Sequence, residues 1–211
     1  MKECLPEGVT RCPDGTFAVE PAMPVGRLET DHLERILTVV KRYGLPGVRL
    51  TAHQRLMIEG IPEDQLEEVI AAFGGAGGHH PISACRGKRT CKRGVRDTLA
   101  MTRRVEAILS EAKEMPAKVK VGVSGCPRCC GGSYVRDIGL VGTARGWTLI
   151  FGGNAGRRAR CGDELLTDRS EAEVLAALER LLAFYREKGK RRERTARFVE
   201  RVGVDAIRDI L

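Results

Sequence analysis

The 211-residue sequence has few aromatic residues and no long apolar segment. Aromatic residues make up 4% of the chain. No run approaches the roughly 18 apolar residues that would indicate a membrane-spanning helix. The first residues, MKECLPEGVTRCPDG, lack the apolar core of a signal peptide. We therefore expect no membrane span and no export, and we predict a cytoplasmic protein.

Further absences narrow the classes of function. No G-x-G-x-x-G segment follows a predicted strand, which argues against a nicotinamide or flavin site. The basic run at residues 188–197 has no interleaved aromatic residues, so it resembles a solvated helix face more than a nucleic-acid site. The sequence shows no internal repeat. Its formal net charge of +8 nevertheless predicts an anionic partner.

Eight cysteines are present, and four of them form two closely spaced pairs. Cys85 and Cys91 lie in ACRGKRTC, and Cys126 and Cys130 lie in SGCPRCCGG. In a reducing compartment such cysteines more often bind metal or carry redox chemistry than form disulfides. Four thiolates without a nearby histidine suit zinc or an iron–sulfur cluster.

The spacing of the cysteines does not decide between these metals. Structural zinc usually takes C-x2-C knuckles, and Cys126 with Cys129 has that spacing whereas the first pair does not. A cubane [4Fe–4S] cluster tolerates wider spacing because its irons occupy separate corners. Four unrelated structural cysteines are the third interpretation. Cys4 and Cys12 are candidates for a further pair, and we interpret Cys161 as structural.

The first 76 residues predict a β-α-β-β-α unit, which is the order of a ferredoxin-like sandwich. Residues 16–28 are expected to be extended. Thr30 or Asp31 is expected to cap a helix that ends before Gly44. This helix should carry Leu33, Ile36, Leu37 and Val40 on one face. Strands at 48–51 and 55–58 and a helix from Pro62 follow, and the glycine-rich segment 74–78 is the expected hinge.

Residues 77–211 are predicted to form a second α+β domain. We expect a helix from about residue 92 to residue 113, strands near 134–142 and 146–151, and a helix from about 170 to 187. In the segment 118–123, alternation predicts a strand with its valines facing the core. Lys118, Lys120 and Ser124 should share its other face. The basic tail should be helical, with a short helix after Gly203.

The motifs together resemble those of the sulfite and nitrite reductase haemoproteins. The cysteine pattern is similar to the cluster signature of that family, and residues 49–54 (RLTAHQ) resemble its R-x-T-x-x-Q strand. Residues 138–142 (IGLVG), 152–154 (GGN) and 199–204 (VERVGV) resemble three further elements. Larger members contain two copies of this unit. Because one copy is present here, the chain resembles the small single-repeat sulfite reductases.

The resemblance implies a sirohaem beside a [4Fe–4S] cluster that is bound by Cys85, Cys91, Cys126 and Cys130. The Cys130 sulfur would bridge the cluster and the haem iron. Sirohaem carries eight carboxylates, and guanidinium groups pair well with carboxylates. The expected binding residues are Arg49, Thr51, Gln54, Arg89, Arg93, Arg128, Cys130, Gly152, Gly153, Asn154, Arg157 and Arg158, with Arg160 as a further candidate.

The resemblance also implies cationic side chains around a small inorganic anion. Arg49, Lys118 and Lys120 match these positions and would stabilise the oxyanion and supply protons. The predicted reaction is the six-electron reduction of sulfite to sulfide, with an external donor such as a ferredoxin or a partner subunit. The alternatives are nitrite reduction to ammonia and a non-catalytic iron–sulfur electron carrier. A homodimer that completes the fold and a monomer both agree with a single repeat.

Overall fold

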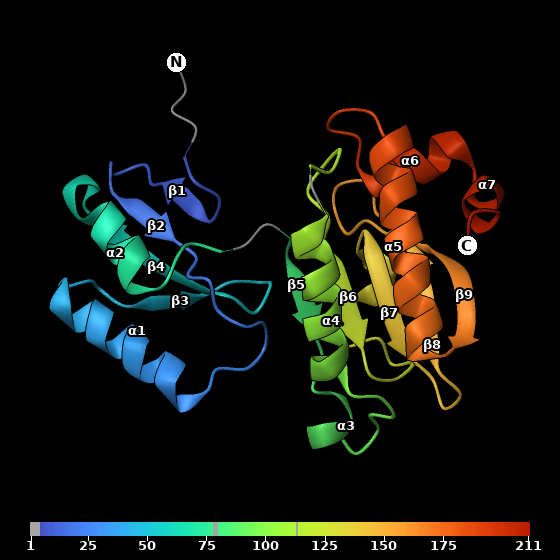
Figure 1. Ribbon diagram of the computed structural model, residues 1–211, viewed down its shortest axis with the longest axis horizontal. Helices are drawn as coiled ribbons and strands as arrows, with labels where there is room; N and C mark the ends of the chain where they lie inside the picture. Colours follow the sequence, from blue (N-terminus) through green and yellow to red (C-terminus); the bar gives the residue numbers. More distant parts are fainter. Residues whose placement is uncertain (1–4, 78–79, 113) are drawn as a thin grey trace. The chain divides into compact units, whose positions relative to one another are not determined.

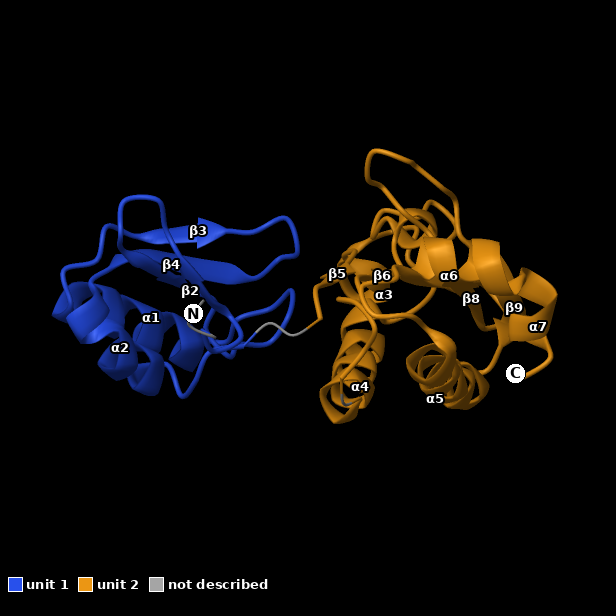
Figure 2. Cartoon of the chain, turned by 90° about the horizontal axis from the view of Figure 1, so that it is seen from above, with its two compact units in different colours: residues 1–79 blue, residues 80–211 orange. Residues whose placement is uncertain are grey.

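The computed structural model describes residues 5–77, 80–112 and 114–211. The chain divides into two compact units, residues 1–79 and 80–211, and each is described by itself (Figures 1 and 2). Both units combine helices with a sheet, which confirms the predicted α+β class. The boundary between residues 76 and 77 stays a prediction. Cys4 and the expected helix end at Lys113 lie outside the described residues.

The first unit packs its helices against a four-stranded antiparallel sheet. Its strands are β1 (Val9–Arg11), β2 (Phe17–Val19), β3 (Val48–Leu50) and β4 (Leu56–Ile61), in the order β1-β2-β4-β3. Its helices are α1 (Thr30–Arg42), the short 3-10 helix η1 (Glu63–Gln65) and α2 (Leu66–Ala72). From β2 to α2 the elements follow the predicted β-α-β-β-α order. The sequence pattern missed β1, and only residues 17–19 of the predicted extended segment 16–28 form a strand.

The predicted cap of α1 is wrong, and the apolar face of this helix is only partly buried. The helix is capped by Glu29, whose backbone N–H donates to His32 Nδ1 at 3.1 Å, and not by Thr30 or Asp31. Leu33 and Leu37 are each 54% exposed. The buried stripe of the helix instead runs through Ile36 and Val39, which pack in the core with Phe17, Ile58, Val69 and Phe73.

The second unit contains a five-stranded sheet in the order β5-β6-β7-β8-β9. The strands are β5 (Ile82–Ala84), β6 (Val121–Ser124), β7 (Ile138–Gly142), β8 (Trp147–Phe151) and β9 (Asp163–Arg169). The first three are parallel, and β8 and β9 are antiparallel to their neighbours. The helices are α3 (Gly87–Thr90), α4 (Thr98–Glu111), η2 (Ser133–Val135), α5 (Glu171–Lys188), α6 (Thr195–Val202) and α7 (Val204–Arg208).

One face of this sheet is covered by α4 and α5, which lie side by side (Figure 1). Met101 and Val105 of α4 and Leu181 of α5 are fully buried. Val121 and Val123 are buried as well, so the prediction that the valines of this strand face the core is confirmed.

Several predicted boundaries in the second unit are wrong. The helix expected from residue 92 begins at Thr98, because the Asp97 carboxylate accepts hydrogen bonds from the N–H groups of Leu99 and Ala100 at 3.1 Å. The strand expected over 118–123 runs from 121 to 124. Residues 134–137 belong to η2 and a loop rather than to a strand. The tail is not helical between residues 189 and 194, and β9 was missed.

The connection from β6 to β7, residues 125–137, is here called the crossover, and it lies against the sheet face opposite α4 and α5. Gly122 and Gly139 face each other in register. A Cβ at Gly122 would lie 2.8 Å from the Gly131 carbonyl oxygen, and one at Gly139 would clash with the Ser133 carbonyl. The Ser133 hydroxyl lies 3.0 Å from the Gly122 carbonyl oxygen. The two glycines therefore let the crossover pack directly on the strands.

The position of the crossover overturns one more expectation. Ser124 was expected on a polar strand face with the two lysines. It is fully buried, and its hydroxyl lies 2.8 Å from that of Ser133. The face opposite the valines is thus covered by the chain itself along β6.

Candidate functional site

The four predicted cluster ligands lie in loops near one edge of the second sheet, here called the cysteine edge. Cys85 follows β5 directly, and Cys126 follows β6 by two residues. Because β5 and β6 are parallel neighbours, their carboxyl ends share one edge. Cys91 follows α3, which lies at that end of the sheet in Figure 1. Cys130 lies in the crossover, one residue before Gly131, whose N–H donates to the Ser124 hydroxyl at 3.0 Å.

Gly125 ties the two cysteine loops together. Its N–H donates to Cys85 Sγ at 3.1 Å. Its carbonyl oxygen accepts hydrogen bonds from the N–H groups of Val95 and Arg96 at 2.9 and 3.1 Å. A Cβ at this position would lie 2.9 Å from the Arg96 carbonyl oxygen and from Gly87 Cα. Only glycine therefore allows this close approach without a shift of the backbone.

The thiol of Cys91 lies in surroundings that favour a thiolate. The backbone N–H of Arg93, followed by that of Gly94 and by the charges of Arg86 and Arg93, holds the pKa of Cys91 below its usual value. Iron and zinc both bind the thiolate form of cysteine. The donor set at the cysteine edge therefore fits a metal centre.

The geometry of the cysteine edge bears on the choice of metal. The seven described cysteines are all free. In the described ranges, no three His, Cys, Asp or Glu side chains come close enough together to hold one metal ion. A structural zinc requires four ligand atoms at about 2.0–2.3 Å from one ion. In a cubane cluster each cysteine binds its own iron, so the sulfur atoms stay further apart. The four cysteines could therefore serve a [4Fe–4S] cluster without converging on one ion.

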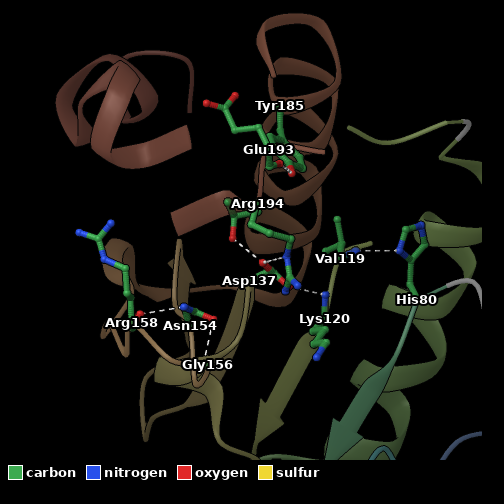
Figure 3. A network of polar contacts seen from close by, with 11 residues as sticks. His80, Val119, Lys120, Asp137, Asn154, Gly156, Arg158, Tyr185, Glu193 and Arg194 are labelled. Carbon is green, nitrogen blue, oxygen red and sulfur yellow. Dashed lines mark hydrogen bonds and ion pairs between the residues drawn. The ribbon is translucent and has the colours of Figure 1, made fainter. Parts of the chain in front are cut away.

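The buried carboxylate of Asp137 organises the opposite end of β6 (Figure 3). The side chain of Asp137 is 2% exposed and forms an ion pair with Arg194. It accepts hydrogen bonds from the Lys120 N–H at 2.8 Å and from Thr195 Oγ1 at 2.7 Å. The start of β6 is thereby joined to the first residues of α6.

Lys118 and Lys120 lie at this opposite end, just before β6. Lys118 is exposed and Lys120 is half-buried. At about 3.3 Å per strand residue, Lys120 and Cys126 are roughly 20 Å apart along the chain direction. The structure therefore places the two lysines and the cysteine edge at opposite ends of the same strand.

The hairpin with the GGN segment also lies at the lysine end, because the last residue of β8, Phe151, pairs with Ile138, the first residue of β7. Asn154 Nδ2 donates to the Arg158 carbonyl oxygen at 2.8 Å, and Asn154 Oδ1 accepts the Gly156 N–H at 3.1 Å (Figure 3). The Asn154 side chain therefore shapes this loop.

The other predicted anion-binding groups in this hairpin differ in whether they already have a partner within the chain. Gly152 and Gly153 are buried, and the Gly152 N–H already donates to the Asp137 carbonyl oxygen at 2.9 Å. Arg160 is held by Asp163, with an N···O distance of 2.6 Å. The remaining two candidates, Arg157 and Arg158, are exposed.

Three further candidates for sirohaem binding, Arg89, Arg93 and Arg128, lie at the cysteine edge. Arg89 forms an ion pair with Asp97 at 2.8 Å, whereas Arg93 and Arg128 are exposed. The predicted arginines of the second unit are thus divided between the two ends of the sheet.

The R-x-T-x-x-Q residues belong to the first unit. Arg49 lies on β3 and forms an ion pair with Glu59 at 3.0 Å. Thr51 and Gln54 line a groove with a volume of about 430 Å³, whose wall also includes Leu33 and Leu50. Gln54 has a φ of 58°, in the left-handed region, within the turn that leads to β4.

Sequence reasoning missed two polar features near the crossover. Asp137 carried one signal, since it is a lone acid directly before a buried strand. The Tyr134 hydroxyl donates a hydrogen bond to Glu164. The pKa of Tyr134 is raised to about 12, mainly by this hydrogen bond and further by burial and by the nearby Cys129 and Cys161. No local pattern predicts this pair, because Glu164 lies on the missed strand β9.

Comparisons with known proteins identify the family. Residues 76–211 match the nitrite and sulphite reductase 4Fe-4S domain, and residues 11–76 match the nitrite/sulfite reductase ferredoxin-like half domain. The chain is 38% identical over 199 residues to an assimilatory-type sulfite reductase of Nitratidesulfovibrio vulgaris, covering 92% of this chain and 91% of that protein.

Two further relatives are much longer than this chain. It is 34% identical over 204 residues to a nitrite reductase [NAD(P)H] of Bacillus subtilis, covering 94% of this chain but 25% of that protein. The structure of the Mycobacterium tuberculosis NirA protein superposes with a TM-score of 0.77 at 26% identity, covering 98% of this chain and 42% of that one. The chain therefore belongs to the nitrite and sulfite reductase family of oxidoreductases, and this membership implies a [4Fe–4S] cluster, a sirohaem, an anionic substrate and an electron donor.

Proposed function

We propose that this chain reduces sulfite to sulfide. The observation that carries the proposal is the likeness to the assimilatory-type sulfite reductase, which extends over 92% of this chain and 91% of the relative. The reaction consumes six electrons and six protons for each hydrogen sulfite and yields hydrosulfide and three water molecules. The site must therefore admit an anion, receive electrons one after another and deliver protons.

The cysteine edge supplies the cluster ligands in this proposal. Cys85, Cys91, Cys126 and Cys130 would hold the [4Fe–4S] cluster, and the exposed Cys130 would be shared with the sirohaem iron. When bound, the cluster supplies electrons and the sirohaem supplies the iron at which the anion is reduced. The N–H groups that face Cys91 favour the thiolate form that such a centre requires.

The cationic residues have the remaining roles. We propose that Arg49, Lys118 and Lys120 bind the anion, stabilise its negative charge and deliver protons. The exposed guanidinium groups of Arg157 and Arg158 are suited to pair with sirohaem carboxylates. The other proposed sirohaem residues are Thr51, Gln54, Arg89, Arg93, Arg128, Gly153 and Asn154, the last through the shape of its loop.

One measurement tests the choice of substrate. The purified holoprotein is given sulfite or nitrite with reduced methyl viologen as a common donor, and sulfide and ammonia are quantified. We expect a larger kcat/KM for sulfite. Nitrite reduction to ammonia, which the similarity to the nitrite reductase supports, is the second candidate. A larger kcat/KM for nitrite would replace the sulfite proposal.

A second measurement tests whether the chain is an enzyme or a carrier. Iron, acid-labile sulfide and extractable tetrapyrrole are determined after anaerobic purification. Iron and sulfide without tetrapyrrole would indicate a non-catalytic electron carrier. The proposal further includes a cytoplasmic location and a separate donor protein. Light scattering of the holoprotein decides between a monomer and the homodimer that would complete the fold.

A further inference from the structure

The loop between the first two cluster ligands is strongly basic. No Asp or Glu occurs between Cys85 and Arg96, and the following acid, Asp97, is paired with Arg89. The exposed basic residues around the cysteine edge are Arg86, Lys88, Arg89, Lys92, Arg93 and Arg128. This concentration of positive charge lies at the opposite end of β6 from the proposed anion-binding lysines. Arg89, Arg93 and Arg128 are among the proposed sirohaem residues, whereas Lys88 and Lys92 have no role in the proposed site.

Within this basic loop two ammonium groups are free to meet a partner. Arg86 donates to the Thr90 carbonyl oxygen at 2.9 Å, and Arg96 donates to the Thr143 carbonyl oxygen at 2.9 Å. Among the described residues, no carboxylate forms an ion pair with Lys88 or Lys92, and both are exposed. Unpaired surface charges of one sign steer an oppositely charged protein and accelerate its association.

An apolar side chain lies beside these lysines. Val95 is 40% exposed, and it is the one large apolar residue that is so exposed in the described part of the second unit. Its backbone N–H is fixed to the Gly125 carbonyl oxygen at 2.9 Å, and the Gly125 N–H is bonded to Cys85 Sγ. An exposed apolar residue held rigidly within a basic rim matches the composition of a protein–protein contact.

We propose that Lys88, Lys92 and Val95 form the docking surface for a small acidic protein that carries a one-electron centre. This inference rests on the proposed function, because it names the donor of the same site. Each encounter oxidises the donor by one electron and reduces the cluster by one, so six encounters supply one sulfite. Weak redox encounters bury less than about 1,200 Å² in total, so such a donor does not need a large docking surface.

The location of the surface supports a donor rather than another ligand. Lys88 lies between Cys85 and Cys91 in the sequence, and Lys92 directly follows Cys91. A protein bound there approaches the cluster ligands themselves. The other basic segment is the run at 188–197. It lies at the lysine end of the sheet, because the Arg192 N–H donates to the Pro116 carbonyl oxygen at 2.7 Å. A donor at that end would be separated from the cysteine edge by the length of β6.

The test uses the holoprotein and a double variant, Lys88→Glu with Lys92→Glu. The matched control is Lys190→Glu with Arg191→Glu, which changes the net charge equally at the other end of the sheet. The probe is an acidic [2Fe–2S] ferredoxin. Its Kd is measured by calorimetry at several salt concentrations, and turnover is measured with the ferredoxin and with reduced methyl viologen, which needs no docking surface.

We expect the Kd of the ferredoxin to rise at least tenfold in the Lys88/Lys92 variant and less than twofold in the control. Turnover with methyl viologen should stay within twofold of the wild type. A Val95→Ser variant should weaken binding without changing its salt dependence, because it removes no charge. Equal losses in both double variants would overturn the proposal, as would a Kd that does not change.

Two other outcomes distinguish a failure of the docking proposal from a failure of the proposed reductase function. If the Lys88/Lys92 variant loses tetrapyrrole, the loop belongs to the sirohaem site and the docking proposal is wrong. If the wild type reduces neither sulfite nor nitrite with methyl viologen, the proposed function fails. The calorimetric comparison of the variants still decides whether the acidic protein docks at this surface.

Discussion

The hydroxyl of Thr195 donates to the buried carboxylate of Asp137 at 2.7 Å, across 58 residues of sequence. With the Lys120 N–H and the Arg194 guanidinium, it surrounds one carboxylate with donors from two other segments of the chain. This contact joins α6 to the end of the sheet where the proposed anion-binding lysines lie. Removal of the Asp137 carboxylate should therefore lower the stability of the fold.

The Asp137→Ala variant should lose about 2–3 kcal/mol of unfolding free energy, because it leaves a buried N–H and a buried hydroxyl without their acceptor. Urea denaturation measures the loss. The control is Glu200→Ala, which removes an exposed ion pair with Arg197 and should cost less than about 0.5 kcal/mol. Equal losses in the two variants would show that Asp137 does not hold α6 in place.

Glu193 and Arg201 should make stability depend on pH. Two hydrogen bonds from the Arg201 guanidinium, at 2.8 and 2.7 Å, hold the pKa of Glu193 at about 2, below its usual value of 4.5. Since the pKa is lower in the folded state, this stabilisation is complete above about pH 4.5 and is lost as the pH falls toward 2.

The Glu193→Gln variant tests this pH dependence. Its unfolding free energy should be about 1 kcal/mol lower than that of the wild type at pH 7. The difference should shrink as the pH falls below 4.5. The control, Glu187→Gln, alters an exposed carboxylate beside Lys188 and should change little. A difference between Glu193→Gln and the wild type that grows on acidification would contradict the assignment.

Gly139→Ala should displace the crossover from the sheet. The new Cβ would clash with the Ser133 carbonyl, and such overpacking costs about 1–3 kcal/mol. Because Cys130 lies in the crossover, the iron content of the purified protein should fall as well. In the control, Gly156→Ala, the nearest atom to the new Cβ is Asn154 Oδ1 at 3.1 Å, in an exposed loop. Full iron content and unchanged stability in Gly139→Ala would be incompatible with this packing.

Cys126→Ser should abolish most of the bound iron and acid-labile sulfide, because one thiolate ligand of the proposed cluster is lost. Cys161→Ser is the matched control, since Cys161 is exposed and is not a proposed ligand. It should retain wild-type iron and sulfide after anaerobic purification. If Cys161→Ser lost more iron and sulfide than Cys126→Ser, Cys161 would replace Cys126 as the proposed cluster ligand.

Lys120→Ala should lower kcat for sulfite at least tenfold while iron and tetrapyrrole contents stay constant, because the ammonium group is proposed to stabilise the anion and deliver protons. Lys120→Arg should recover part of the electrostatic effect. Arg103→Ala, an exposed substitution on α4, should leave kcat within twofold. An unchanged kcat in Lys120→Ala would remove this residue from the site.

The local sequence was sufficient to predict most elements and to propose a metal centre with thiolate ligands. Two cysteine pairs with flanking glycines predict a polythiolate site because the ligand types and short spacings are local properties. The helix expected from about residue 170 begins at Glu171 with Ser170 as its cap, since a capping box is formed by residues close in sequence. The order β-α-β-β-α was also readable, because it depends on short runs of alternating or helical periodicity.

Long-range pairing decided the rest. No local pattern indicates that Gly122 faces Gly139, because strand register involves residues far apart in sequence. The same holds for the hydrogen bond from the Gly125 N–H to Cys85 Sγ, which joins two loops that are 40 residues apart in sequence. The parallel alignment of β5 and β6 brings the cysteines to one edge, while Lys118 and Lys120 lie at the start of β6. The residue types thus specify what the chain can bind, whereas the strand pairing determines which groups lie together, because side chains converge only where the backbone directs them.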